Sequence, residues 1–266
     1  MIRAGGVVVA LIVLGAVFGP LLSPFDPAAQ NLPLRLLGPA WGHPFGFDEL
    51  GRDVLSRVLL GARVSLAVGF VVVSVSATVG LIVGAVAGYL GGAVDDVVSR
   101  LMDVLMAFPG ILLAIAIVAV LGPGVVNAVL ALVAVGWVGY ARLVRGIVLR
   151  VRELEYVAAA RAAGARLPRL LVRHIVPNTL PAVVVQATLG MAAAILAEAS
   201  LSFLGLGVQP PVPSWGTMLD AGRAHLLDAP HVTLFPGFML ASLVLGFNFL
   251  GDGLRDLIDP KTNRRR

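Results

Sequence analysis

The sequence predicts an all-α polytopic membrane protein with six transmembrane helices. Of its 266 residues, 58% are hydrophobic and only 13% are charged, and the mean hydropathy is +0.95. A soluble domain is nearer to half apolar and a quarter charged, so these few charges could not cover so much apolar surface in water. Six apolar runs are long enough to cross a bilayer, and most of the basic residues fall on one side of them.

Each expected span follows from the length of its apolar run, because a membrane helix needs about 20 apolar residues to cross about 30 Å of hydrocarbon. The first run, 4–22, forms an N-terminal segment 1–24 that ends at Ser23-Pro24. A cleaved signal peptide is the alternative, but this run exceeds the usual 7–15 apolar residues. The other five spans lie in a core, 62–254, at 66–90, 104–121, 125–141, 182–204 and 232–250.

The basic residues predict the orientation of these spans. If the N-terminus is cytoplasmic, the outer segments hold five basic residues and leave 15 of the 20 inside; the five are Arg35, Arg52, Arg57, Arg63 and Arg223. The positive-inside rule then places both termini in the cytoplasm, including a basic tail, 255–266. The net charge of +5 therefore reflects topology, and it implies no nucleic-acid partner.

Residues 25–61 are expected outside the membrane and to contain an amphipathic helix. Four charged residues there alternate in sign at near-helical spacing: Asp48, Arg52, Asp53 and Arg57. They could pair along one solvated helix face, or they could contact a binding protein. The loop 205–230, which contains Trp215, is also expected outside and could contact the same partner.

The second span carries a small residue at every fourth position, Gly80, Gly84 and Gly88. Such a ridge lets another helix approach closely. Packing within the chain is the first interpretation, and pairing with a second membrane subunit is the alternative.

The fifth span contains a carboxylate, Glu198, with Ser202 one turn later. An ionisable side chain in the apolar zone is costly, so it should face the bundle interior or water. One interpretation is a translocation path or gate formed by these two residues. The other is an interhelical hydrogen bond.

The chain lacks the motifs of an enzyme. It has no P-loop, its one lysine is Lys261, and its four histidines are scattered along the chain without ligand spacing. A nucleotide site, a metal site and a bound cofactor are therefore not expected. If the protein drives transport, the energy must come from a partner or from an ion gradient.

The long cytoplasmic loop, 142–181, is expected to form two short helices with a sharp bend between them. Strong helix formers run from Glu153 to Ala163, Gly164 can cap that helix, and Pro168 can begin the next. The alanine-rich helix could insert into a groove on another protein. It could also lie on anionic lipid through the nearby arginines.

This loop resembles the EAA loop of bacterial ABC importer permeases, in which a coupling helix binds the ATPase subunit. The matching stretch is Glu155-Tyr-Val-Ala-Ala-Ala-Arg-Ala-Ala-Gly164-Ala, followed by His174-Ile-Val-Pro177-Asn178. Ala158 stands where the family has a glutamate, so the resemblance supports no ion pair there. The coupling residues that the resemblance implies are Glu155, Ala158, Ala159, Ala160, Arg161, Gly164, Ala165 and Pro177.

Three further stretches resemble the dipeptide, oligopeptide and nickel group of these permeases, and favour the "C" member of the permease pair. They begin at His43-Pro-Phe-Gly-Phe-Asp48, at Asp103-Val-Leu-Met-Ala-Phe-Pro109 and at Leu201-Ser-Phe-Leu-Gly-Leu-Gly207. The resemblance covers nearly everything from about residue 20 to Pro260. It implies the ABC transmembrane type-1 fold in a bacterial cytoplasmic (inner) membrane.

The implied function is ATP-driven import of peptides, without an ATPase site in this chain. The implied partners are a homologous second permease, two ATPase subunits or one fused ATPase that use ATP and Mg, an extracytoplasmic binding protein and membrane lipid. Nickel chelates or haem are alternative cargoes. An ion-gradient porter or channel is the alternative of a different class, although the chain lacks the paired half-helix signals of such porters.

Overall fold

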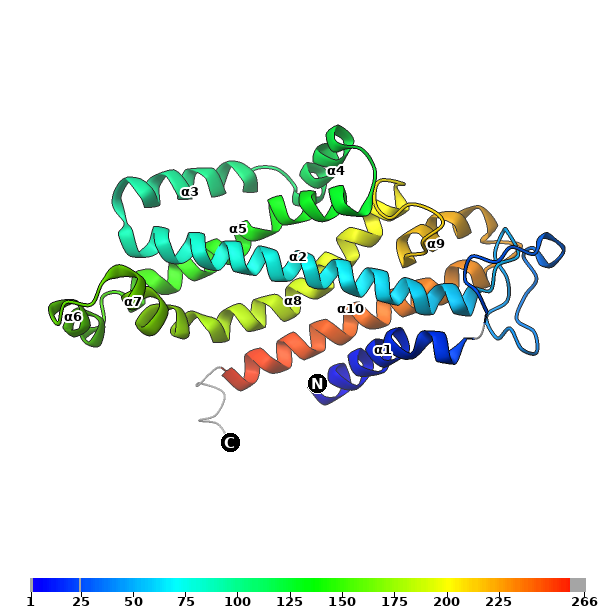
Figure 1. Ribbon diagram of the computed structural model, residues 1–266, viewed down its shortest axis with the longest axis horizontal. Helices are drawn as coiled ribbons and strands as arrows, with labels where there is room; N and C mark the ends of the chain where they lie inside the picture. The colour runs from blue at the N-terminus through cyan, green and yellow to red at the C-terminus, as the bar shows by residue number, and fades with distance from the viewer. Residues whose placement is uncertain (1, 24, 259–266) are drawn as a thin grey trace.

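The computed structural model describes residues 2–23 and 25–258, apart from the side chain of Pro20. The regular structure in this part is helical, with only two isolated β-bridges. The last eight residues of the predicted tail, 259–266, lie outside it. Five long helices form an elongated bundle (Figure 1). They are α1 (Ile2–Leu22), α2 (Val54–Leu90), α5 (Val125–Val151), α8 (Val176–Phe203) and α10 (His231–Ile258).

The span predicted at 104–121 is not one straight helix. The structure has α3 (Gly92–Met106) and α4 (Gly110–Leu121), which meet at an angle of 88°. Pro109 lies at the break, where its ring removes an N–H and disfavours a helical conformation at the residue before it. Five helices are therefore long and apolar enough to cross a membrane, and the bent pair makes a sixth if it counts as one span.

Several helices extend well beyond the predicted spans. Helix α5 runs to Val151 instead of 141, and α10 runs to Ile258 instead of 250. Helix α2 begins at Val54 instead of 66, because Asp53 caps its N-terminus by accepting a 2.7 Å hydrogen bond from the Ser56 N–H. Hydropathy identifies only the part of a helix that lies in the hydrocarbon of the bilayer. The helix itself can continue beyond that part, so it is longer than the predicted span.

The predicted amphipathic helix within 25–61 is wrong as a separate element. Residues 25–53 are non-helical except for one 3₁₀ turn, η1 (Leu32–Leu34), and the charged positions after it belong to a loop and to the start of α2. Alternating charges at near-helical spacing are also compatible with a loop that folds back to pair them.

The glycine ridge of α2 packs against α5 within the same chain, which confirms the first interpretation. A Cβ on Gly80 would come within 2.7 Å of the Trp137 carbonyl oxygen and 2.8 Å of the Ala141 nitrogen. A Cβ on Gly84 would lie 3.0 Å from Cα of Ala141. The absent side chains thus let the two helix backbones approach, and the shared core includes Val144 and Val148 of α5.

We expect Gly80→Ala to destabilise the bundle, because its methyl group would meet the backbone of α5. Overpacking of this kind costs about 1–3 kcal/mol, measurable as thermal unfolding in detergent micelles. Gly146 of α5 is the control, since a Cβ there meets nothing within 4 Å. Equal stability of Gly80→Ala and Gly146→Ala would contradict this packing.

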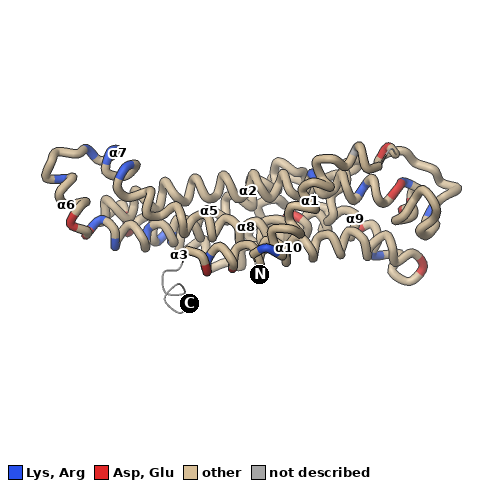
Figure 2. Tube along the Cα trace, turned by 90° about the horizontal axis from the view of Figure 1, so that it is seen from below, with Lys and Arg blue, Asp and Glu red and all other residues tan. Residues whose placement is uncertain are grey.

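Apart from α3 and α4, which lie along one side, the short helices lie toward the two ends of the bundle (Figure 1). One end carries α6 (Glu155–Ala162), α7 (Leu167–Leu170) and the π-turn η2 (Leu171–Ile175), and the other carries the loop 25–53. Helix α9 (Trp215–Gly222) and the 3₁₀ turn η3 (Arg223–His225) lie toward that second end. Charged residues gather toward the two ends, and the middle stretches of the long helices are largely uncharged (Figure 2).

Candidate functional site

Helix α6 is a short, well-terminated helix at the tip of the bundle. Gly164 follows it with a φ of +81°, the left-handed conformation that favours glycine. The Gly164 N–H donates to the Arg161 carbonyl at 3.0 Å, and the Ala165 N–H donates to the Ala160 carbonyl at 3.1 Å. This pair of bonds is a Schellman motif, so the predicted cap at Gly164 is confirmed.

The two faces of α6 differ in what they contact. Val157 is fully buried in the main core, and Ala160 and Ala165 pack against that core. Ala158 and Ala159 are exposed on the other face. Helix α6 therefore has an anchoring face and a free face of small side chains, and the predicted coupling residues divide between the two.

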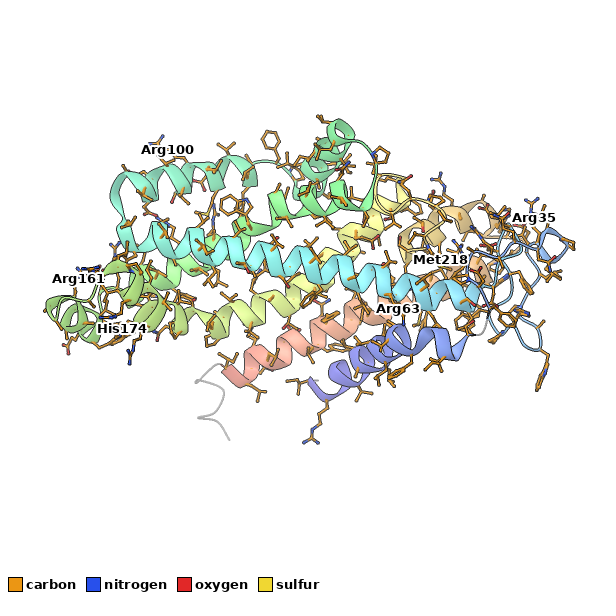
Figure 3. All side chains as sticks on the ribbon, viewed as in Figure 1. Arg35, Arg63, Arg100, Arg161, His174 and Met218 are labelled. Carbon is orange, nitrogen blue, oxygen red and sulfur yellow. The ribbon has the colours of Figure 1, made fainter. Side chains whose placement is uncertain are left out.

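Two arginines contact the end of α2, Arg161 from α6 and Arg152 from the C-terminus of α5. The Arg161 guanidinium lies 5.8 Å from the centroid of the Tyr89 ring, a cation–π distance. Arg152 donates a 2.8 Å hydrogen bond to the Gly88 carbonyl oxygen. Arg161 lies at the tip together with His174 (Figure 3), and the structure places it against α2.

Tyr156 and Asn178 connect α6 to the beginning of α8, and the sequence analysis did not identify this link. The Asn178 amide donates to the Tyr156 hydroxyl at 3.1 Å and to the His174 carbonyl oxygen at 2.7 Å. The Tyr156 hydroxyl donates to the same carbonyl at 3.3 Å. A polar aromatic on an alanine-rich helix was the signal available in the sequence.

Helices α7, η2 and α8 form one continuous helical stretch, Leu167–Phe203, of 37 residues. Pro177 lies in the first turn of α8 and Pro181 lies inside that helix, so the helix begins before the span predicted at 182–204. The stretch is continuous, and the hydrogen bond between Asn178 and Tyr156 joins α6 directly to it.

Glu198 is 1% exposed and joins α8 to α2. Its carboxylate accepts hydrogen bonds from Ser65 at 2.9 Å and from Ser202 at 2.7 Å. The Ser202 hydroxyl, in turn, accepts the Val208 N–H at 3.0 Å. This geometry is that of an interhelical hydrogen bond, the second of the two interpretations of Glu198. That Glu198 and Ser202 line a translocation path or gate stays a prediction.

We expect Glu198→Gln to keep import and stability near those of the parent, because an amide can bond both serine hydroxyls. Glu198→Ala orphans the hydroxyls and should lower the free energy of unfolding by about 1–3 kcal/mol. Thermal unfolding and import assays on the same preparations measure both effects. A loss of import in Glu198→Gln at unchanged stability would instead favour the interpretation that Glu198 lines the translocation path.

The charged residues predicted at the other end are buried, with exposures of 3% for Asp48, 8% for Arg52, 5% for Asp53 and 6% for Arg57. Asp48 lies 2.6 Å from Nε of Arg52 and 3.2 Å from Nε of Arg57, and Asp53 lies 2.8 Å from Nδ1 of His43. The four side chains therefore hold the loop 25–53 on α2 and do not form a solvated helix face, whereas their contact with a binding protein stays a prediction.

Trp215 is also buried, with an exposure of 0%. Its indole N–H donates a 3.1 Å hydrogen bond to the Val58 carbonyl oxygen of α2. Trp215 thus anchors α9 in the bundle, and contact of the loop 205–230 with a binding protein stays a prediction. Trp215 follows the helix N-cap, Ser214. A large aromatic side chain at such a position can pack into the core as well as lie on the surface.

Comparison with known proteins places these features in a family. Residues 80–264, more than half of the chain, match the model described as binding-protein-dependent transport system inner membrane component. Residues 1–39 match the N-terminal TM domain of oligopeptide transport permease C. Relatives include the dipeptide transport system permease protein DppC of Alkalihalophilus pseudofirmus, which is 48% identical over 97% of this chain and 84% of its own length.

A second relative is the glutathione transport system permease protein GsiD of Shigella dysenteriae, 47% identical over 98% of this chain and 86% of its own length. The fold is similar to that of a chain of the MetNI methionine ABC transporter in an inward-facing form, with a TM-score of 0.59 and 23% identity. That match covers 75% of this chain and 95% of the other, and supports the type I importer fold. The chain therefore belongs to the binding-protein-dependent transport system inner membrane components, in the group of ABC importer permeases that contains the dipeptide, oligopeptide and glutathione permeases.

Proposed function

We propose that this chain is the permease subunit through which an ATP-driven importer carries peptides across the cytoplasmic membrane, coupled to separate ATPase subunits by α6. The supporting observation is the arrangement of α6, whose free face of Ala158 and Ala159 lies at the tip of the bundle. Its other face is anchored by Val157, and Asn178 ties it to α8. A surface of small side chains on a helix that is anchored to the bundle suits docking to an ATPase subunit and transmission of that subunit's movement.

Peptides are the proposed cargo because the named relatives carry dipeptides and glutathione. The partners would be a homologous second permease, two ATPase subunits or one fused ATPase, and an extracytoplasmic binding protein. ATP and Mg would be used by the ATPases alone. The α6 end would face the cytoplasm, as the positive-inside rule predicts, and the end with the loop 25–53 would face the binding protein.

The test is uptake of a radiolabelled dipeptide into proteoliposomes that contain this chain, its partner permease, the ATPases and the binding protein. Uptake should require ATP and the binding protein, and it should continue when ion gradients are dissipated by ionophores. Uptake that survives ATP depletion but collapses with the gradient would support the porter. Replacement of the dipeptide by a nickel chelate or haem in the same vesicles tests the alternative cargoes.

A further inference from the structure

A cavity of about 260 Å³ lies among α2, α4, α5 and α8. Its walls are mostly apolar, and the glycines Gly136, Gly139 and Gly190 widen it. Pockets that enclose a whole small-molecule ligand usually exceed about 300 Å³. This cavity is therefore suited to one or two residues of a longer or larger molecule.

Three polar side chains line the cavity, and all are neutral: Ser76 of α2, Tyr140 of α5 and Gln186 of α8. Ser76 is 1% exposed, and its hydroxyl has no hydrogen-bond partner among the described residues. A buried hydroxyl without a partner costs about 1–3 kcal/mol, so a polar group that hydrogen-bonds to Ser76 would be stabilised there. The Tyr140 hydroxyl makes only a long hydrogen bond, 3.5 Å, to the Gln186 carbonyl oxygen.

The charge of the lining decides which chemistry fits. Among the described residues that line the cavity none is charged, and a charge left unpaired in an apolar site is costly. A primary amide such as that of Gln186 can both donate to and accept from a peptide group. The lining thus suits an internal peptide bond of a longer peptide, next to a neutral side chain, and disfavours a free carboxylate or ammonium group.

We propose that this cavity is a transit site for the peptide cargo, in which Gln186 and Ser76 bind one peptide group and the glycines make room for a neutral side chain. This inference rests on the proposed function and assigns residues that contact the cargo. It also predicts that the membrane subunit contributes to cargo preference, in addition to any choice made by the binding protein.

The test is Gln186→Glu, which places a carboxylate at the rim of the neutral cavity. Import of the pentapeptides Ala-Ala-Lys-Ala-Ala and Ala-Ala-Glu-Ala-Ala is measured in the reconstituted importer with an unchanged binding protein. The ratio of the two rates should shift toward the lysine peptide by about fivefold to tenfold, because a carboxylate attracts one side chain and repels the other. Gln30→Glu, the same change at an exposed position in the loop 25–53, should leave the ratio unchanged.

An unchanged ratio in Gln186→Glu, with binding-protein-stimulated ATPase activity intact, would overturn the inference and leave the proposed function standing. Failure of the parent to import either peptide would instead refute the proposed function. If Gln186→Glu does not assemble, Gln186→Leu provides the second measurement. It should raise the KM for pentaalanine about threefold to tenfold, and an unchanged KM would also overturn the inference.

Discussion

Ala159→Arg is expected to reduce peptide import at least about 100-fold while the protein still assembles. Ala159 lies on the free face of α6, so an arginine there does not disturb the core that holds Val157. It would, however, bring a long charged side chain into a groove that fits an alanine. A 100-fold loss corresponds to about 3 kcal/mol of impaired docking.

The measurements are import in proteoliposomes and ATPase activity stimulated by the binding protein. Both should fall in Ala159→Arg, whereas basal ATPase activity should remain. Ala93→Arg is the control, because Ala93 is an exposed alanine in the first turn of α3 and lies outside α6. Full coupling in Ala159→Arg would refute the assignment of α6.

The same face permits a direct contact test, since the chain has no cysteine. A single cysteine at Ala159 should cross-link to cysteines placed along the docking groove of the ATPase. Ala160 is a poorer probe, because it packs against the core. The two neighbouring alanines cannot be distinguished from the sequence. Only their burial shows that Ala159 lies on the free face of α6 and Ala160 on the face that packs against the core.

Asp48→Ala is expected to destabilise the end of the bundle opposite α6 by about 3–5 kcal/mol, the usual cost of breaking a buried ion pair from one side. The substitution would leave Arg52 and Arg57 buried without their carboxylate. It would also remove the acceptor of the Leu50 and Arg52 N–H groups, at 2.9 and 3.0 Å. The loop 25–53 should then detach from α2.

Limited proteolysis of the loop 25–53 and thermal unfolding in detergent measure this effect. Asp48→Ala should be cleaved within the loop under conditions that leave the parent intact. Glu49→Ala is the matched control, because the neighbouring carboxylate is half-buried and forms no ion pair among the described residues. Equal protease resistance of the two variants would show that Asp48 does not hold the loop.

The sequence by itself determined the class of the protein. Apolar runs of membrane length predicted the helical membrane fold, the helix formers that end at Gly164 predicted α6, and the motifs predicted the permease family. These features are local: a span needs about 20 apolar residues, and a helix end needs a residue that adopts a positive φ. They can therefore be identified without knowing what lies beside them.

The tertiary structure decided which of the marked side chains are available to a partner. Trp215 and the charged residues near Asp48 resemble surface features in the sequence, but they are buried because segments distant in the chain fold over them. The bend at Pro109, the Tyr156–Asn178 link and the neutral cavity around Gln186 likewise depend on several helices meeting. Burial and partnership are properties of the packed bundle, since each needs atoms from elsewhere in the chain, and residue type and spacing alone do not specify them.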